Sequence, residues 1–281
     1  MGGGGHIGRV PILPLYGHAA LRERLLATHA RGALPASLLL QGPRGVGKQR
    51  LALWLGQALL CAGAPAARAA GEPCGACQPC RYALALAHPD LHWYFPRPRL
   101  KDADASPADV AADYAAARTE RVERQGLYAP AGGGEGLYVA TVRALVQQAA
   151  VSPALGRRKV FVVGDAERMV PQEGADAAAN AFLKLLEEPP ADTTLVLTSS
   201  EPGALLPTIR SRVVTVRVAP LPDAEVHDFL ADPAVAAALP ALGVRGEPAA
   251  LAALAGGAPG TLLAGGERSA VDAEVGRIVD A

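Results

Sequence analysis

The stretch Leu38–Gln49, LLLQGPRGVGKQ, limits what this chain can fold into more than any other part of its sequence. An apolar run breaks into a glycine-rich turn that ends in a lysine, and apolar residues at helical spacing follow. This order of strand, loop and helix is the context that a phosphate-binding loop requires. It predicts an α/β fold with a parallel sheet flanked by helices. The alternative is a glycine-rich turn that merely precedes a helix.

The composition of the loop suits a nucleotide. Three glycines bring backbone N–H groups close to phosphate oxygens, and Lys48 adds a positive charge. The predicted nucleotide-binding residues are Gly42, Pro43, Arg44, Gly45, Val46, Gly47, Lys48 and Gln49.

Gln49 departs from the phosphate-loop pattern. The residue after the lysine is normally Ser or Thr, whose hydroxyl ligates Mg²⁺ beside the phosphates. A longer amide side chain reaches a metal there only if the loop is displaced. We therefore expect ATP and Mg²⁺ as possible ligands and leave open whether the chain hydrolyses ATP.

Length and charge narrow the class of protein. The 281 residues are 50% hydrophobic, which is enough for a sizeable core and two domains. Lys plus Arg and Asp plus Glu both number 27, so no global field draws the chain to nucleic acid or a membrane. The longest apolar stretch, Leu51–Ala67, falls short of a membrane span. Because the N-terminus MGGGGHIGRV has no apolar signal core, we expect a cytoplasmic location and no membrane partner.

The four cysteines indicate a metal site. Cys74, Cys77 and Cys80 are spaced by two residues, and Cys61 precedes them at the end of the predicted loop helix. This spacing favours a structural Zn²⁺ bound by four thiolates, with no coordination position left for catalysis. A redox pair or idle thiols are the alternatives.

Candidate catalytic residues stand at the ends of two buried strands. The run 160–163 is followed by Asp165 and Glu167, and Thr198 lies near the end of the run 194–200. In phosphate-loop ATPases a carboxylate at such a place holds Mg²⁺ and another orients the attacking water. Asp165, Glu167 and Thr198 would fill these roles and that of a γ-phosphate sensor in an active enzyme. Thr198 could equally cap the following turn.

Composition divides the chain further. Residues 1–15 are rich in Gly and Pro and predict a flexible arm, and residues 16–219 predict the phosphate-loop domain. Within it the zinc module spans 61–80, and residues 96–137 predict an insertion whose mixed-charge helix faces solvent. The alanine-rich residues 220–281 predict a small helical lid. His18 is either structural or a contact for a nucleotide base.

Several motifs together resemble one family. They are LYGHAALRERL, LLLQGPRGVGK, the four cysteines, HPDLHW, KVFVVGDAERM, AAANAFLKLLEEPPADTTLVLTS and LLPTIRSR. The chain resembles the clamp-loader branch of the AAA+ ATPases, as found in bacterial DNA polymerase III. This resemblance covers nearly the whole chain and implies an AAA+ phosphate-loop domain, an inserted zinc module and a helical lid.

The family contains ATP-hydrolysing gamma/tau subunits and subunits that assist them. The resemblance favours an assisting subunit for four reasons. HPDLHW is followed by a long insertion, Gln49 replaces the hydroxyl, Ala166 stands where a second acid is expected, and Gly260 stands where a lid arginine is expected. An ATP-hydrolysing subunit is the alternative.

The resemblance also implies roles and partners. Arg212 matches an arginine that family members supply in trans to a neighbouring ATP site, although Val213 replaces the usual cysteine. The implied partners are the gamma/tau and delta subunits, the sliding clamp and, through the complex, primed DNA. The family has a third, helical collar domain, and the chain ends at Ala281 before one could fit, so we expect the collar to be absent or truncated. A zinc-ribbon nucleic-acid binder is a third possibility, although the cysteine segment has few basic residues.

Overall fold

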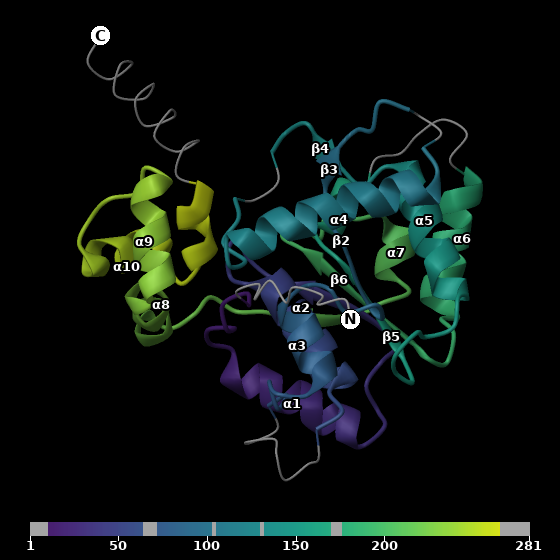
Figure 1. The fold of residues 1–281 in the computed structure, drawn as a ribbon, viewed down its shortest axis with the longest axis horizontal. Coiled ribbons are helices and arrows are strands. Elements are labelled where there is room, and N and C mark those ends of the chain that lie inside the picture. The colour runs from purple at the N-terminus through teal and green to yellow at the C-terminus, as the bar shows by residue number, and fades with distance from the viewer. Residues whose placement is uncertain (1–10, 64–71, 103–104, 130–131, 170–175, 265–281) are drawn as a thin grey trace, which may run out of the picture.

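The structure is a computed structural model that describes residues 11–63, 72–102, 105–129, 132–169 and 176–264. Two layers of helices enclose a five-stranded sheet, and a smaller group of helices lies beside it (Figure 1). The sheet strands are β1 (Ser37–Gln41), β2 (Leu91–Tyr94), β5 (Lys159–Val163), β6 (Thr193–Ser199) and β7 (Val214–Arg217). Within the described ranges, no helix combines the length and the apolar character needed to cross a membrane.

The sheet is parallel throughout, in the order β2-β5-β6-β1-β7. Parallel strands covered on both faces need nearly continuous apolar runs, and β1, β5 and β6 are buried along almost all of their length. Because all five strands run the same way, their carboxyl ends share one edge of the sheet, which places the phosphate loop beside Asp165 and Ser200. The predicted α/β class and the two predicted strands that end in polar residues are confirmed.

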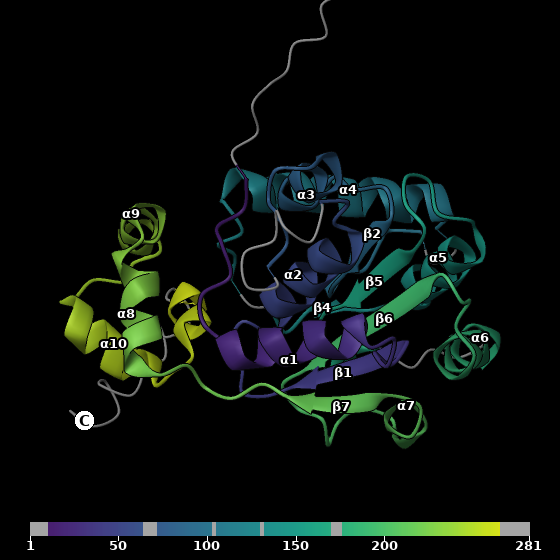
Figure 2. The same cartoon turned by 90° about the horizontal axis from the view of Figure 1, so that it is seen from below.

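Helices cover both faces of the sheet. In Figures 1 and 2, α1 (Ala19–Ala30) and α2 (Lys48–Leu60) lie on one side, and α5 (Val139–Ala150) and α6 (Asp176–Glu187) lie on the other. The helix α2 packs against β1, β2, β5 and β6, so the helix that begins at the phosphate loop is also central to the core. The remaining elements of this domain are α3 (Gln78–Leu84), β3 (Arg97–Pro98), α4 (Pro107–Glu123), β4 (Glu135–Gly136), the short helix η3 (Ala166–Arg168) and α7 (Pro207–Arg210).

The helix of the predicted insertion packs one face onto the core and exposes the other face to solvent. The strands β3 and β4 of the insertion pair as an antiparallel ribbon. The helix α4 is started by a capping box between Ser106 and Asp109, and it buries Val110, Tyr114 and Ala117. The Tyr114 hydroxyl donates a hydrogen bond of 2.6 Å to the carbonyl of Phe95. The helix α4 therefore carries an apolar stripe at helical spacing between its charged residues.

The start of the chain also differs from the expectation of a loose arm. Residues 1–10 lie outside the described residues, but Ile12 is buried and its N–H donates to the carbonyl of Leu84. Leu13 donates in the same way to Gln125, and Leu15 packs against the main core. The apolar residues of 11–15 are thus held by the domain despite the surrounding prolines.

The lid is helical, as predicted, and has its own core. It consists of α8 (Asp223–Ala231), α9 (Pro233–Ala241), α10 (Pro248–Ala255) and η4 (Pro259–Ala264), and residues 265–281 lie outside the described residues. Its apolar residues form a cluster separate from the main core. Tyr16 joins the two parts: its ring meets Phe229 edge-on, and its hydroxyl donates a 2.5 Å hydrogen bond to Asp232.

Candidate nucleotide and metal sites

The phosphate loop has the predicted strand, turn and helix geometry. It connects β1 to α2, and two of its glycines have left-handed backbone angles, with φ of +84° at Gly45 and +91° at Gly47. Gly42 is required for a different reason, since a Cβ there would lie 2.1 Å from the carbonyl oxygen of Val218. The three predicted glycines thus permit a conformation that residues with side chains would strain.

Lys48 donates three hydrogen bonds within the chain. Its Nζ donates to the carbonyls of Gly42 at 3.0 Å and Pro43 at 2.8 Å, and to the hydroxyl of Ser200 at 2.8 Å. Burial lowers the pKa of Lys48 to about 8, against the opposing effect of the nearby carboxylates. The ammonium is therefore mainly charged at neutral pH, and all three of its donors are already used.

Gln49 stands where the phosphate-loop pattern has a hydroxyl that ligates Mg²⁺. Its Nε2 donates a 3.1 Å hydrogen bond to Oδ2 of Asp165, and its Oε1 accepts one of 3.0 Å from the indole N–H of Trp93. The amide packs onto bare backbone at Gly164, where a Cβ would lie 2.4 Å from Oε1. The side chain therefore joins the first turn of α2 to the carboxylate that would hold Mg²⁺ in an ATPase.

The three candidate catalytic side chains converge beside the loop, but each has a local partner. Asp165 has a left-handed φ of +46°, and its backbone N–H donates to the hydroxyl of Thr198 at 3.0 Å. Oε1 of Glu167 accepts the N–H of Ser200 at 2.9 Å, while its buried Oε2 has no hydrogen-bond partner among the described residues. Burial and then the charge of Glu167 raise the pKa of Asp165. These hydrogen bonds hold together the turns that follow β5 and β6.

The lid rests directly on the phosphate loop. The N–H of Gly260 donates a 2.9 Å hydrogen bond to the carbonyl of Gly45, and a Cβ on Gly260 would lie 2.8 Å from that oxygen. On the other side, Nε2 of His18 donates to the carbonyl of Val46 at 2.7 Å. His18 thus contacts the loop backbone, and the place expected for a lid arginine holds a glycine in tight contact.

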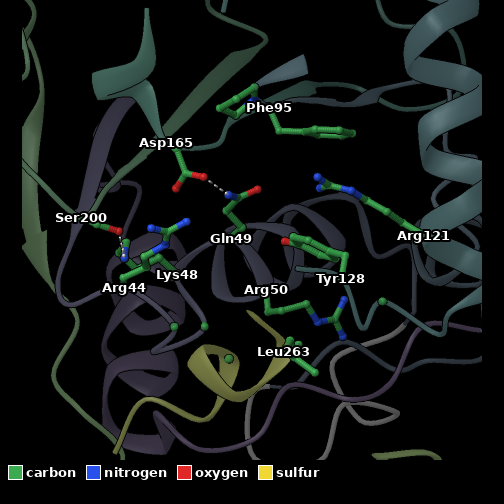
Figure 3. A pocket seen from close by; sticks show the side chains of 15 residues that line it. Arg44, Lys48, Gln49, Arg50, Phe95, Arg121, Tyr128, Asp165, Ser200 and Leu263 are labelled. Atoms are coloured by element: carbon green, nitrogen blue, oxygen red, sulfur yellow. Dashed lines mark hydrogen bonds between the residues drawn. The ribbon is translucent and has the colours of Figure 1, made fainter. Parts of the chain in front are cut away.

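A pocket of about 120 Å³ remains beside the loop (Figure 3). Three of its side chains were not singled out by sequence: Arg121, Phe95 and Tyr128 (Figure 3). The guanidinium carbon of Arg121 lies 3.3 Å from the ring centroid of Phe95 and 3.8 Å from that of Tyr128. The sequence could have indicated that Arg121 faces inward, because it falls on the same helical face of α4 as Val110, Tyr114 and Ala117.

Arg212 follows the short helix α7 and does not line this pocket. Its Nε lies 3.1 Å from Oε2 of Glu187, and another guanidinium nitrogen donates to the carbonyl of Thr208 at 3.0 Å. The side chain is 29% exposed. The structure therefore separates Arg212 from the phosphate loop of its own chain.

The four cysteines form one cluster, whose sulfur atoms all lie within 4.8 Å of one another. The sulfur atoms of Cys61 and Cys74 lie 3.5 Å apart, and those of Cys77 and Cys61 lie 3.9 Å apart. Four sulfurs at zinc-bond length around a tetrahedral ion would be about 3.8 Å apart. Backbone N–H groups, that of Cys77 foremost, lower the pKa of Cys74 to about 6, which favours thiolate. The cluster could bind a metal, and its dimensions fit Zn²⁺.

Comparison with known proteins gives a consistent family. The family described as "DNA polymerase III, delta subunit" matches residues 17–222. The DNA polymerase III subunit delta' of Pseudomonas aeruginosa is 37% identical over 186 residues, which is 66% of this chain and 43% of that protein. The delta' subunit of Escherichia coli is 31% identical over 201 residues, covering 72% of this chain and 47% of that protein. A DNA polymerase III subunit gamma/tau of Mycobacterium tuberculosis is 32% identical over 181 residues, covering 64% of this chain and 24% of that protein. The matched region spans less than half the length of these relatives.

Proposed function

The chain belongs to the DNA polymerase III delta-subunit family, and from this premise we propose that it acts as a delta'-type subunit of a bacterial clamp loader. In that role it would assemble with gamma/tau and delta subunits in the cytoplasm. The assembly would place the sliding clamp onto primed DNA. The chain would contribute to ATP hydrolysis by a neighbour while turning over little or no ATP itself.

The contacts of Gln49 support the proposal that the chain itself turns over little or no ATP. The Gln49 amide is hydrogen-bonded to Asp165 at one end and to Trp93 at the other. A magnesium ion needs a hydroxyl from the loop and a free carboxylate, and these contacts supply neither. Lys48 and Glu167 lie nearby, but without the metal they have no bridge to a γ-phosphate. We infer that the loop is kept as a scaffold.

Arg212 is the group that this subunit would offer to its neighbour. An arginine supplied in trans stabilises the charge that develops on the transferred phosphoryl group, and it raises turnover in other NTPases by about 10³ to 10⁵. The contacts of Arg212 with Glu187 and Thr208 hold its guanidinium at the end of α7. A partly exposed arginine that is already held in place loses less side-chain entropy on docking than a free one.

The test compares two neighbouring arginines in a reconstituted complex with clamp and primed DNA. Arg212→Ala should abolish hydrolysis at the adjacent site, seen as a missing fraction of single-turnover phosphate release. Arg210→Ala is the matched control, because Arg210 is exposed and, among the described residues, its side chain donates one long hydrogen bond of 3.4 Å, to the carbonyl of Pro202. Equal phosphate release by both variants and the wild type would refute a role for Arg212 in trans.

We further propose that the metal of the cysteine cluster is Zn²⁺ and that it is structural. Cys61 lies at the end of α2 and Cys80 lies within α3, so a bound ion would tie these two helices together. Four thiolates complete a tetrahedral shell and leave no position for water, so the ion would brace the fold and take no part in hydrolysis.

An ATP-hydrolysing subunit is the second candidate, favoured by the phosphate loop, Lys48 and the paired acids standing together. Lys48→Ala separates the two functions. If this chain is itself a motor, the substitution should abolish turnover by the purified protein and lower that of the complex. If it is an assisting subunit, turnover by the complex should not change, because the neighbouring sites do the hydrolysis.

A further inference from the structure

The guanidinium of Arg212 is held by groups from two neighbouring helices. Its Nε donates a 3.1 Å hydrogen bond to Oε2 of Glu187, the last residue of α6. Its Nη1 donates one of 3.0 Å to the carbonyl of Thr208 in α7 and a longer one of 3.4 Å to the hydroxyl of Ser211. Figures 1 and 2 show α6 and α7 side by side. Two of the three guanidinium nitrogens are therefore engaged within the chain.

The third nitrogen of Arg212, Nη2, makes no hydrogen bond to any described residue. It is not buried, because the buried polar atoms without a partner do not include it. A guanidinium is planar and rigid, so two bonded nitrogens fix the direction of the third. Nη2 therefore offers two N–H donors to solvent in a fixed orientation.

Glu187 is placed by its buried neighbours. The side chain of Leu186 is 2% exposed, and the carbonyl of this residue accepts a 2.9 Å hydrogen bond from the hydroxyl of Ser37, the first residue of β1. Pro189 and Pro190 follow, and prolines cannot continue a helix, so α6 ends at Glu187. The carboxylate thus stands on a turn that is tied to the sheet.

The backbone of Arg212 is anchored in a similar way. The helix α7 begins at Pro207, and it buries Ile209, whose residue is 2% exposed. The N–H of Arg212 donates a 3.0 Å hydrogen bond to the carbonyl of Ile209. Both ends of the ion pair therefore rest on residues that are packed into the core, and the relative position of the two side chains is set by the fold.

The ion pair between Arg212 and Glu187 contributes little to the stability of the fold, because the Glu187 side chain is 58% exposed and water screens such pairs. Its effect is on the orientation of the arginine. A long side chain that must adopt one rotamer on docking loses entropy, and the pair selects that rotamer beforehand. Small errors in the position of a group that assists a reaction lower its rate.

We propose that Glu187 is a positioning residue for the arginine supplied in trans. It holds Nε of Arg212 so that Nη2 is presented to the phosphoryl group bound by the neighbouring subunit, and it acts only through Arg212. This inference rests on the proposed function, to which it adds the residue that orients the arginine.

The experiment measures single-turnover phosphate release at the adjacent site in the reconstituted complex with clamp and primed DNA. Glu187→Ala should slow release by about fivefold, the rate equivalent of a strong exposed ion pair. Glu188→Ala is the matched control and should not slow it, because Glu188 is also exposed and forms no ion pair with a described residue. Glu187→Gln should recover most of the rate, because its amide oxygen still accepts from Nε. Equal rates in Glu187→Ala and Glu188→Ala, or no recovery in Glu187→Gln, would overturn the proposal.

A double substitution separates positioning from a structural role of Glu187. Adding Glu187→Ala to Arg212→Ala should not slow phosphate release further, because no guanidinium remains to be oriented. A further loss would show that Glu187 supports the assembly by itself, which contradicts positioning. The two proposals fail separately. A wild-type rate in Arg212→Ala refutes the arginine in trans and this inference with it, whereas a slow Arg212→Ala beside a wild-type rate in Glu187→Ala refutes the positioning role alone.

Discussion

The N–H of Gly260 in the lid donates a 2.9 Å hydrogen bond to the carbonyl of Gly45 in the phosphate loop. Both residues lack a side chain at the point of contact, and the two backbones could not approach so closely otherwise. The contact links the lid to the phosphate loop. It also places a glycine at the position where the family resemblance led us to expect the arginine of an active lid.

Gly260→Ala should loosen the lid. The added Cβ would lie 2.8 Å from the Gly45 oxygen, and overpacking of this kind costs about 1–3 kcal/mol. Chemical denaturation should show this loss of stability, and hydrogen exchange should show faster exchange at Gly260. Gly203→Ala is the control, because nothing lies within 4 Å of a Cβ there. An equally small effect of both substitutions would contradict the close contact.

Gln49→Met tests the amide bridge. Methionine has a similar length but cannot pair with Asp165 or Trp93, so two polar groups lose their partner. We expect a loss of about 1–3 kcal/mol in the free energy of unfolding, and a change in Trp93 fluorescence. Gln147→Met provides the comparison at an exposed glutamine. If stability and fluorescence do not change, Gln49 is not held as described.

The lowered pKa of Asp90 should make the free energy of unfolding fall at acidic pH. Burial alone would raise the pKa of Asp90, but backbone N–H groups of Ala154, Leu155 and Gly156 donate to its carboxylate and lower it. A carboxyl group with a lowered pKa in the folded state stabilises the fold above its unfolded pKa of about 3.9. That contribution is lost as the pH falls further.

Asp90→Asn should remove this contribution at neutral pH. The free energy of unfolding of the variant should then depend less on pH in the acidic range. Denaturation measured from pH 6 to pH 3 should show the difference between wild type and variant shrinking as the pH falls. The exposed Asp228 serves as control through Asp228→Asn, which should shift the whole curve little. A constant difference across the pH range would show that the charge of Asp90 is not what holds the segment.

Metal removal should destabilise the junction of α2 and α3. Elemental analysis should give one zinc per chain in the wild type and much less in Cys80→Ser, because a buried ligand is lost. A chelator should lower the melting temperature of the wild type, and added Zn²⁺ should restore it. A chain that is purified without metal and melts at the same temperature with and without zinc would rule out the structural role.

The strands of the sheet could be predicted from the sequence because buried parallel strands are continuous apolar runs. The apolar runs of β1, β5 and β6 are bounded by turns, and the polar residues after them mark the edge where the site forms. The cysteine cluster was equally accessible, since two-residue spacers leave few ways to arrange three thiols. The relatives then agreed with the family indicated by the motifs.

The detailed contacts of the site could not be predicted from the sequence. Gln49 was recognised as a departure from the metal-binding pattern, but its bond to Trp93 joins residues 44 positions apart. Arg121 was hidden among the alternating charges of α4, and its aromatic partners come from separate segments. Such contacts depend on tertiary packing, and a local pattern does not specify which side chains meet across a pocket.

We propose that Gln49 blocks Mg²⁺ binding at the phosphate loop and makes this chain a poor ATPase. The most direct measurement is Mg²⁺-dependent ATP turnover by the purified protein, compared side by side with Gln49→Thr. The wild type should show no turnover above background, and Gln49→Thr should show Mg²⁺-dependent turnover if its hydroxyl restores the site. Robust turnover by the wild type, equal to or greater than that of Gln49→Thr, would contradict it.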